Sequence, residues 1–308
     1  MSKYHILTLN QIASIGLHRF PATRYLVGKA VDRPDGILVR SCNMHEMTIP
    51  ASVRAISRAG AGTDNIPVAE MSRRGSPVFN APGANANAVK ELVFAALLLA
   101  ARNIIPALGY VAALKSDAPH LERLVEEGKK QFAGVELPGR PLGSLGLRPS
   151  RRLPADPALQ HGETALQVDR NREVAAARRL PSSVRKAHSI EELLKQSDFV
   201  TLHVPLLGAT THLIGEQRLA VMKPDGALLN FARDAIVDEA AVVAALRAHR
   251  LKYYLCDFPG ARLLGEPGVV SLPHLGASTE EAEENCAIMA VNQLREYLEH
   301  GPITNAVN

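Results

Sequence analysis

Two side chains suited to acid–base and anion-binding chemistry follow short apolar runs late in the chain. His274 stands in the run PHLGAST, just before a helical pattern, and Arg233 closes the run NFAR. An imidazole exchanges protons near neutral pH, and the planar guanidinium fork suits a carboxylate. Because ligands of open parallel sheets bind beyond the carboxyl ends of the strands, these residues predict a site for proton transfer on a carboxylate-bearing substrate.

Each of these residues also has a structural explanation. A lone histidine beside a proline is more often structural than catalytic, and Arg233 could pair with Asp234 or Asp238, which contributes little energy at a surface. Asp257, in the run CDFP, could cap a loop, lie beside a nicotinamide or stabilise a charged imidazole. The succession of three such motifs after three strand-like runs favours the chemical interpretation.

The motifs NFAR, CDFP and PHLGAST, in this order, resemble those of the D-2-hydroxyacid dehydrogenases. Upstream, VRS (39–41), RAGAGTDNI (58–66) and VFNAPGAN (78–85) resemble substrate-domain loops of the phosphoglycerate dehydrogenase branch of that family. Together the matches cover most of the chain. The resemblance implies an α/β fold of two Rossmann-like domains with parallel sheets, a discontinuous substrate domain and NAD as the cofactor.

The function implied by the resemblance is hydride transfer between NAD and a small 2-hydroxy acid. The leading expectation is oxidation of 3-phosphoglycerate to 3-phosphohydroxypyruvate, the first step of serine biosynthesis. Arg40, Ser41 and Asn85 would contact the phosphorylated substrate, although Asn85 could merely hold a turn. Arg233 would bind the substrate carboxylate, and His274 would be the general acid/base. A homodimer built through the nucleotide domain is implied as well.

Two other functions stay open. A hydroxypyruvate or glyoxylate reductase would use the same chemistry on an unphosphorylated substrate, whereas Arg40 and the net charge of +4 favour a phosphate. A catalytically impaired dinucleotide-binding scaffold is the alternative from another class. It is motivated by a missing glutamate: the family places a carboxylate partner of the histidine shortly after the Asp257 position, where this chain reads Gly-Ala-Arg (260–262). Glu266 is a weak substitute candidate, so we expect an altered pH profile of activity.

The predicted cofactor loop departs further from its pattern. A dinucleotide-binding loop needs G-x-G-x-x-G, but this chain reads GLRPSR (146–151), so only Gly146 survives. Arg148 puts a Cβ where backbone should meet the pyrophosphate, and Arg151 crowds the helix that should follow. The segment is either a genuinely altered loop or a stretch of corrupted sequence.

Other cofactor positions are nevertheless retained. Asp169 follows Gly146 at about 20 residues, where an acid binds the adenosine ribose hydroxyls. Arg170 and Arg172 beside it leave room for a 2′-phosphate. The residues expected at the cofactor are Gly146, Pro149, Ser150, Asp169, Phe231, Ala232, Asp257, Gly276 and Ala277.

The pattern along the chain alternates strand-like and helical segments, which favours an α/β fold. Strands are predicted at 4–9, 37–40, 53–59, 199–204, 227–231, 253–258 and 269–272. An apolar helix at 87–103 should lie between two packed bodies. We predict a substrate domain at 1–95, an NAD-binding Rossmann-type domain at 96–276, and a C-terminal helix within 277–308 that returns to the substrate domain.

Capping boxes mark two predicted helix starts. Ser189 with Glu192, and Ser278 with Glu281, place a hydroxyl three residues before a carboxylate. The second box should begin a long helix from residue 279 to about 300, with Gly301 as its stop. The sequence ends at residue 308, so we expect no regulatory module after this helix.

Composition sets the outer bounds. A chain of 308 residues with 46% hydrophobic and 21% charged residues predicts two folded domains. Cys42, Cys256 and Cys286 are odd in number and show no C-x-x-C spacing, which fits reduced thiols in a cytoplasm. The start of the chain lacks the apolar core of a secretory signal, and no metal site is predicted. We therefore expect a cytoplasmic enzyme that binds a small anionic substrate, with neither nucleic acid nor membrane as a partner.

Overall fold

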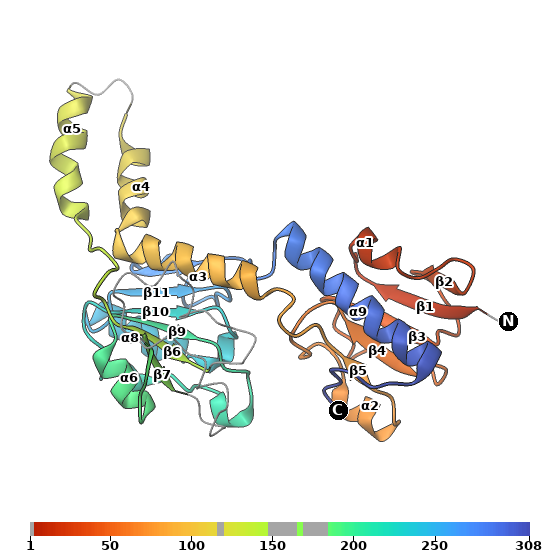
Figure 1. Cartoon of the computed structure of the whole chain (residues 1–308). Helices are drawn as coiled ribbons and strands as arrows, with labels where there is room; N and C mark the ends of the chain where they lie inside the picture. Colours follow the sequence, from red (N-terminus) through yellow and green to blue (C-terminus); the bar gives the residue numbers. More distant parts are fainter. Residues whose placement is uncertain (1–2, 116–119, 147–164, 169–183) are drawn as a thin grey trace. The chain divides into compact units, whose positions relative to one another are not determined.

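The computed structural model describes residues 3–115, 120–146, 165–168 and 184–308. Contacts divide the chain into unit 1, Met1–Ala88 with Ala277–Asn308, and unit 2, Val89–Gly276. Figure 1 shows that each unit is built around one sheet. The dividing point falls inside helix α3 (Ala86–Ala101), the same helix that contains the predicted boundary at residue 95. Both sheets are entirely parallel, which confirms the predicted fold class.

Unit 1 contains a five-stranded sheet in the order β2-β1-β3-β4-β5. Its strands are β1 (Tyr4–Leu9), β2 (Tyr25–Gly28), β3 (Gly36–Val39), β4 (Ala55–Arg58) and β5 (Val78–Phe79). Its complete helices are α1 (Ser14–Leu17), α2 (Val68–Arg73) and α9 (Glu280–His300). The central strands β3 and β4 are short and almost wholly buried on both faces, and β3 is an apolar run without alternation.

Helix α9 completes the core of unit 1. Its buried side chains, among them Ala287 and Leu294, pack with apolar residues of β1 and β3. A Cβ on Gly16 of α1 would come within 2.7 Å of Ala287, so the glycine permits the close crossing of α1 and α9. Ser57 of β4 donates a hydrogen bond to the carbonyl of Ala290 at 2.9 Å.

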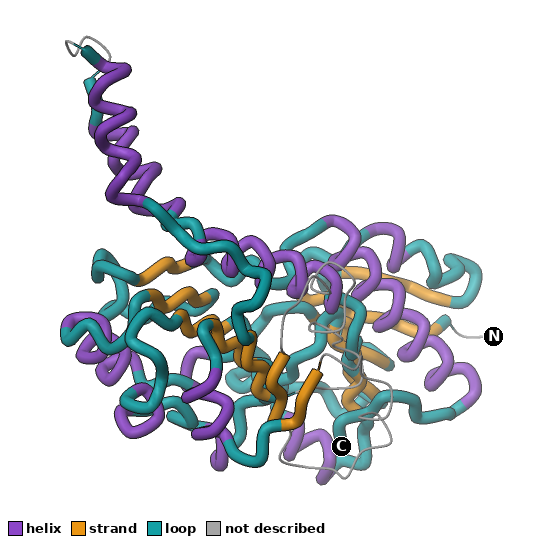
Figure 2. Tube along the Cα trace, turned by 60° about the vertical axis from the view of Figure 1, so that its left-hand side comes forward, coloured by secondary structure: helices purple, strands orange, loops and turns teal. Residues whose placement is uncertain are grey.

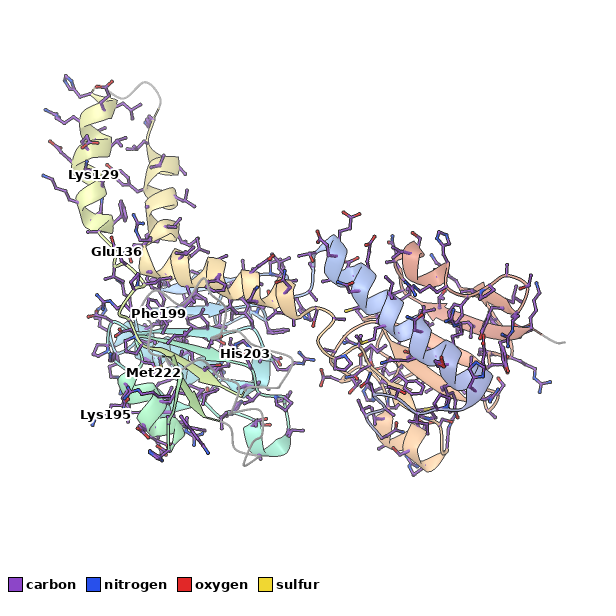
Figure 3. The ribbon with its side chains drawn as sticks, in the orientation of Figure 1. Lys129, Glu136, Lys195, Phe199, His203 and Met222 are labelled. Atoms are coloured by element: carbon purple, nitrogen blue, oxygen red, sulfur yellow. The ribbon has the colours of Figure 1, made fainter. Side chains whose placement is uncertain are left out.

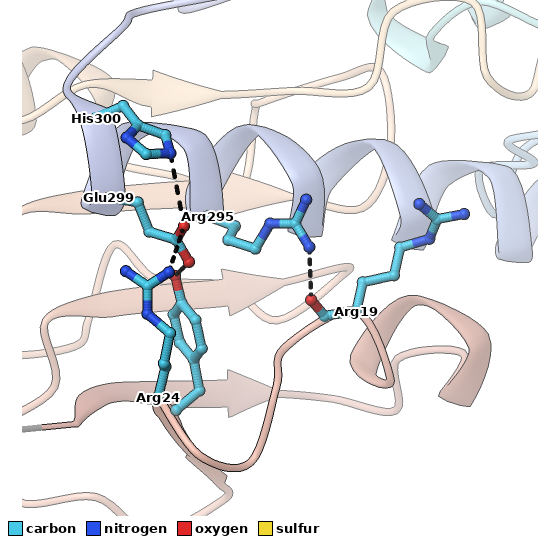
Figure 4. Close-up of polar contacts among 6 residues, drawn as sticks. Arg19, Arg24, Arg295, Glu299 and His300 are labelled. Atoms are coloured by element: carbon cyan, nitrogen blue, oxygen red, sulfur yellow. Dashed lines mark hydrogen bonds and ion pairs between the residues drawn. The ribbon is translucent and has the colours of Figure 1, made fainter.

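The carboxyl end of α9 is tied to the start of β2 by polar contacts (Figure 4). Glu299 accepts hydrogen bonds from Arg24 Nη1 at 3.0 Å and from the Tyr25 hydroxyl at 2.6 Å. Burial, followed by the hydrogen bond to Glu299, raises the pKa of Tyr25 above its ordinary value, so the phenol stays a donor. Arg295 donates to the carbonyl of Arg19 at 3.0 Å. The last turn is thereby held on the sheet.

Unit 2 contains a seven-stranded sheet in the order β12-β11-β10-β9-β6-β7-β8. Its strands are β6 (Leu142–Leu145), β7 (Ala165–Val168), β8 (Val184–Lys186), β9 (Phe199–Leu202), β10 (Ala227–Asn230), β11 (Tyr253–Cys256) and β12 (Val269–Ser271). Helices α6 (Ile190–Gln196), α7 (Glu216–Leu219) and α8 (Glu239–Arg247) cover one face, and α3 covers the other. Strand order reverses between β6 and β9, which is the point where such sheets bind dinucleotides.

A pair of helices, α4 (Ile104–Ala113) and α5 (Leu121–Gly128), projects from the body of unit 2 in Figures 1 and 2. Tyr110 joins them: its hydroxyl donates to the Leu124 carbonyl at 2.7 Å, and its ring lies 5.5 Å from that of Phe132. Leu108 and Val111 of α4 are 60% and 57% exposed. The sequence analysis did not predict this apolar projection.

The predicted strands and the two long helices are confirmed, with ends shifted by up to two residues. At the first capping box, Ser189 accepts from the Glu192 amide at 3.0 Å, and the Glu192 carboxylate accepts from the His188 amide. The second box was placed one residue early. The cap of α9 is Thr279, not Ser278, and its hydroxyl accepts from the Ala282 amide at 3.1 Å.

In the part of the chain that the structure describes, no single helix has the length and apolar character needed to cross a membrane. Helices α3 and α4 meet these criteria only as a pair, and the pair is bent by 65°.

Candidate active site

The candidate site lies at the carboxyl edge of the sheet in unit 2. Asn230, Cys256 and Ser271 are level with one another at the ends of three adjacent parallel strands. Arg233 and His274 therefore follow strands that stop at the same edge of this sheet. Figure 3 labels Phe199 at the start of β9 and His203 just past its end, so His203 marks this carboxyl edge. The structure thus brings the predicted base and the predicted cation to one side of one domain.

The turn that carries Arg233 is shaped by Asn230, which is fully buried. The Asn230 amide group donates to the Arg233 carbonyl at 2.8 Å and to the Tyr254 hydroxyl at 3.3 Å. Its oxygen accepts from the Ala232 amide at 3.2 Å. A buried amide with every group bonded fixes one backbone path. Arg233 is consequently presented at the surface by a rigid turn, with Phe231 and Ala232 buried behind it.

The loop that carries His274 is held by Asp257, whose side chain is 1% exposed. Its two carboxylate oxygens accept from the Leu275 and Gly276 amides, each at 2.7 Å, and its carbonyl accepts from the His274 amide at 3.0 Å. The His274 backbone has φ 55°, a left-handed conformation. This conformation costs a residue that has a Cβ atom about 1 kcal/mol. The three bonds from Asp257 hold that conformation in place. These contacts match the loop-capping interpretation of Asp257.

His274 lies at the wall of a cavity of about 310 Å³. Its ring is exposed and stands 4.6 Å from the ring of Phe258, tilted by 56°. Three acidic residues, Asp234, Glu239 and Asp257, also line this cavity. A titrating imidazole in a cavity with carboxylates can take up or release a proton near neutral pH.

The structure pairs Glu266, the weak substitute candidate for the missing glutamate, with Arg247. Arg247 donates to its two oxygens at 2.9 and 2.7 Å, and this hydrogen bonding is the main cause that lowers the pKa of the Glu266 carboxyl. Glu266 lines a different cavity, at the base of α4. Glu239, which the sequence analysis did not single out, lines the cavity of His274. It accepts from the Gly260 amide at 2.9 Å, at the place where the family's glutamate was expected.

The close approach of Glu239 depends on the glycine at 260. A Cβ on Gly260 would come within 2.5 Å of both Glu239 oxygens, so a side chain there would displace the carboxylate. Two features of the sequence could have pointed to Glu239: Gly260 stands where the family places its glutamate, and Glu239 stands at the start of a helix. They could not be used, because their proximity depends on how α8 packs beside β11.

The described part of the cofactor loop fits a dinucleotide. Gly146 follows β6 with φ 83°, and a Cβ there would lie 2.6 Å from Val204 and 3.1 Å from the His203 backbone. The loops after β6 and β9 therefore touch where the strand order reverses, and only glycine permits it. Arg148, Pro149, Ser150, Arg151 and Asp169 lie outside the described residues. Gly276 and Ala277 follow His274 at the end of unit 2 and the start of unit 1.

The predicted substrate residues belong to unit 1. Arg40 follows β3, and its guanidinium Nη2 donates to Glu283 Oε1 at 2.6 Å. Ser41 is exposed, with its amide donating to Asn10 Oδ1 at 3.1 Å. Asn85 lies in the turn just before α3. Arg40 and Ser41 share one loop, while Asn85 comes from a different one.

Comparison with known proteins places these features in a family. Residues 95–276 match the model of the D-isomer specific 2-hydroxyacid dehydrogenase NAD binding domain. The chain is 34% identical over 264 residues to a D-3-phosphoglycerate dehydrogenase of Methanocaldococcus jannaschii, covering 83% of this chain and 48% of that protein. It is 32% identical over 265 residues to a glyoxylate reductase of Thermococcus litoralis, covering 83% and 77%.

A solved structure agrees in fold. That of a glyoxylate reductase from Paecilomyes thermophila matches with a TM-score of 0.81 and 25% identity, covering 100% of this chain and 99% of that one. The chain spans about half the length of several curated relatives, among them the phosphoglycerate dehydrogenase of M. jannaschii. The family model matches most of unit 2, and the curated relatives match the chain along most of its length. The chain therefore belongs to the D-isomer specific 2-hydroxyacid dehydrogenase family and carries its NAD binding domain.

Proposed function

We propose that this chain is an NAD-dependent D-2-hydroxyacid dehydrogenase acting on 3-phosphoglycerate and 3-phosphohydroxypyruvate in the cytoplasm, at the first step of serine biosynthesis. The observation that carries the proposal is the placement of Arg233 and His274 at one carboxyl edge of the NAD binding domain. His274 takes the proton of the substrate hydroxyl, and Arg233 holds the carboxylate. NAD, when bound, supplies the hydride acceptor.

Residues of unit 1 would bind the substrate phosphate. Arg40 carries the positive charge, and Ser41 and Asn85 can donate hydrogen bonds to phosphate oxygens. Asp257 acts beneath the surface by holding the loop of His274. Glu239 lies in the cavity of His274 and serves as the carboxylate partner of the imidazole, because residues 260–262 contain no glutamate.

A second candidate function is reduction of glyoxylate or hydroxypyruvate. It is favoured by the ion pair between Arg40 and Glu283, which offsets the charge that would bind a phosphate. The similarity to a glyoxylate reductase over 83% of the chain supports it as well.

The test has two stages. Binding of NADH, followed by its fluorescence, separates an enzyme from an impaired scaffold, and Arg148→Gly with Arg151→Gly should raise the affinity if the altered loop weakens it. Consumption of NADH is then compared for phosphohydroxypyruvate, hydroxypyruvate and glyoxylate, with His274→Asn as the control for contaminating dehydrogenases. Phosphohydroxypyruvate should have the highest kcat/KM. Preference for glyoxylate would select the second candidate, and failure to bind NADH would refute both.

We also propose that the chain forms a homodimer through unit 2. Support comes from the apolar side chains that α4 and α5 leave exposed, since contiguous exposed apolar surface marks protein interfaces. Leu108→Glu should give a monomer in sedimentation velocity with an unchanged circular dichroism spectrum, because Leu108 is 60% exposed and contributes little to the core. A monomeric parent chain would contradict the proposal.

A further inference from the structure

Arg40, the arginine expected to bind the substrate phosphate, already forms an ion pair with the carboxylate of Glu283. Arg40 Nη2 lies 2.6 Å from Glu283 Oε1, and the two side chains are 33% and 40% exposed. Glu283 lies in the first turn of α9, four residues after the cap Thr279. The pair is therefore open to solutes, and it contributes little to folding compared with a buried pair.

The backbone of Arg40 is held from two sides, which fixes the point from which its side chain extends toward this carboxylate. Its carbonyl accepts from Arg58 Nε at 2.9 Å and from Asn65 Nδ2 at 3.3 Å. The amides of the next two residues, Ser41 and Cys42, both donate to Asn10 Oδ1. A ligand that approaches Arg40 therefore meets Glu283 as well.

The local charge is small for an anion site. Burial raises the pKa of the nearby Cys286 thiol to about 11, opposed by the charges of Arg58 and Arg40 and assisted by that of Glu283. Arg58 belongs to the same cluster, because its Nε donates to the Arg40 carbonyl at 2.9 Å, and Arg40 in turn pairs with Glu283. Arg40, Arg58 and Glu283 together carry a net charge of +1. Removing the carboxylate would double the net positive charge of the cluster from +1 to +2. Such a change acts most strongly on a doubly charged ligand.

We propose that Glu283 is a specificity-determining residue that competes with a substrate phosphate for Arg40. This inference rests on the proposed function, because it assigns Arg40 to the substrate. A phosphorylated substrate must displace the Glu283 carboxylate and tolerate its repulsion. An unphosphorylated 2-oxo acid has no group that needs Arg40. Glu283 therefore shifts the preference of the site toward unphosphorylated substrates.

The experiment measures a ratio, so general losses of activity cancel. The kcat/KM for phosphohydroxypyruvate divided by that for glyoxylate should rise about fivefold in Glu283→Gln, the gain expected from releasing a partly exposed ion pair. Glu281→Gln is the matched control. It removes the same charge from an exposed residue of the same turn, and the ratio should stay as in the parent chain. In an Arg40→Gln background, Glu283→Gln should no longer change the ratio.

Binding of 3-phosphoglycerate, measured by calorimetry without cofactor, makes the inference independent of turnover. Glu283→Gln should bind it about fivefold more tightly than the parent chain. Equal or weaker binding by a folded Glu283→Gln variant overturns the proposal and would mean that Glu283 positions Arg40 for the phosphate. Tighter binding without turnover of any 2-oxo acid upholds the competition at Arg40 and counts against the proposed dehydrogenase activity instead.

Discussion

Asp257 offers a decisive test of how the site is built. Its carboxylate is buried and accepts two backbone amides at 2.7 Å, so Asp257→Asn turns one oxygen into a donor that faces another donor. One charge-assisted hydrogen bond is lost and one buried amide is left unpaired, which together cost about 3 kcal/mol. For a domain of the size of unit 2, that loss corresponds to a decrease of about 6 to 12 °C in unfolding temperature.

The loop strain adds a functional consequence. With the Leu275 or Gly276 amide released, the left-handed backbone at His274 is no longer held, and the imidazole samples other positions. We therefore expect kcat to fall further than the affinity for NADH. Because the chain contains no tryptophan, unfolding is best followed by circular dichroism, alongside NADH consumption.

Asp234→Asn is the matched control, since it removes an exposed carboxylate from the same edge of the sheet. Its unfolding temperature should stay within about 2 °C of the parent value. The reasoning is refuted if Asp257→Asn unfolds at the parent temperature, or if it melts early but retains full kcat at low temperature.

Three further predictions concern single side chains. His274→Gln should lower kcat by about 10²- to 10⁴-fold with little change in NADH affinity, and equal losses in both would speak for a structural histidine. Glu239→Gln should move the upper limb of the kcat/KM pH profile to lower pH, because only Asp234 and Asp257 then remain beside His274 to favour the imidazolium. Glu266→Gln is the control and should not move this limb, since Glu266 lines a different cavity. Thiol labelling at pH 8 should modify Cys42 and spare Cys286, because burial raises the Cys286 pKa from 9.0 to about 11, and fast labelling of Cys286 in folded protein would contradict its burial.

The parallel sheets were predictable because short buried strands separated by helical segments leave few other folds. The strands at 227–230 and 253–256 and the helix at 280–300 were visible as patterns of apolar residues. Strand ends in turn predicted the edge that carries Arg233 and His274, since residue order alone places them after parallel strands.

What the sequence could not provide was the pairing of side chains from distant segments. Glu239 and Gly260 are 21 residues apart, and Arg40 and Glu283 are 243 apart. The place of Glu239 at a helix start did not suffice to prefer it over Glu266, because only packing assigns one to the cavity of His274 and the other to Arg247. The projecting pair α4 and α5 was missed because its apolar residues do not face the core of unit 2.

The order of synthesis follows from the discontinuity of unit 1. All of unit 2 leaves the ribosome before α9, so it can fold while the five-stranded sheet still lacks its covering helix. Asn308, which also follows unit 2 in the chain, lies at the sheet edge: it accepts from the Val78 amide at 2.8 Å and donates to the Ser76 carbonyl at 3.1 Å. The nascent segment 1–88 therefore keeps apolar strands uncovered until α9 has been synthesised. We expect chaperone contacts to concentrate on residues 1–88 during that interval.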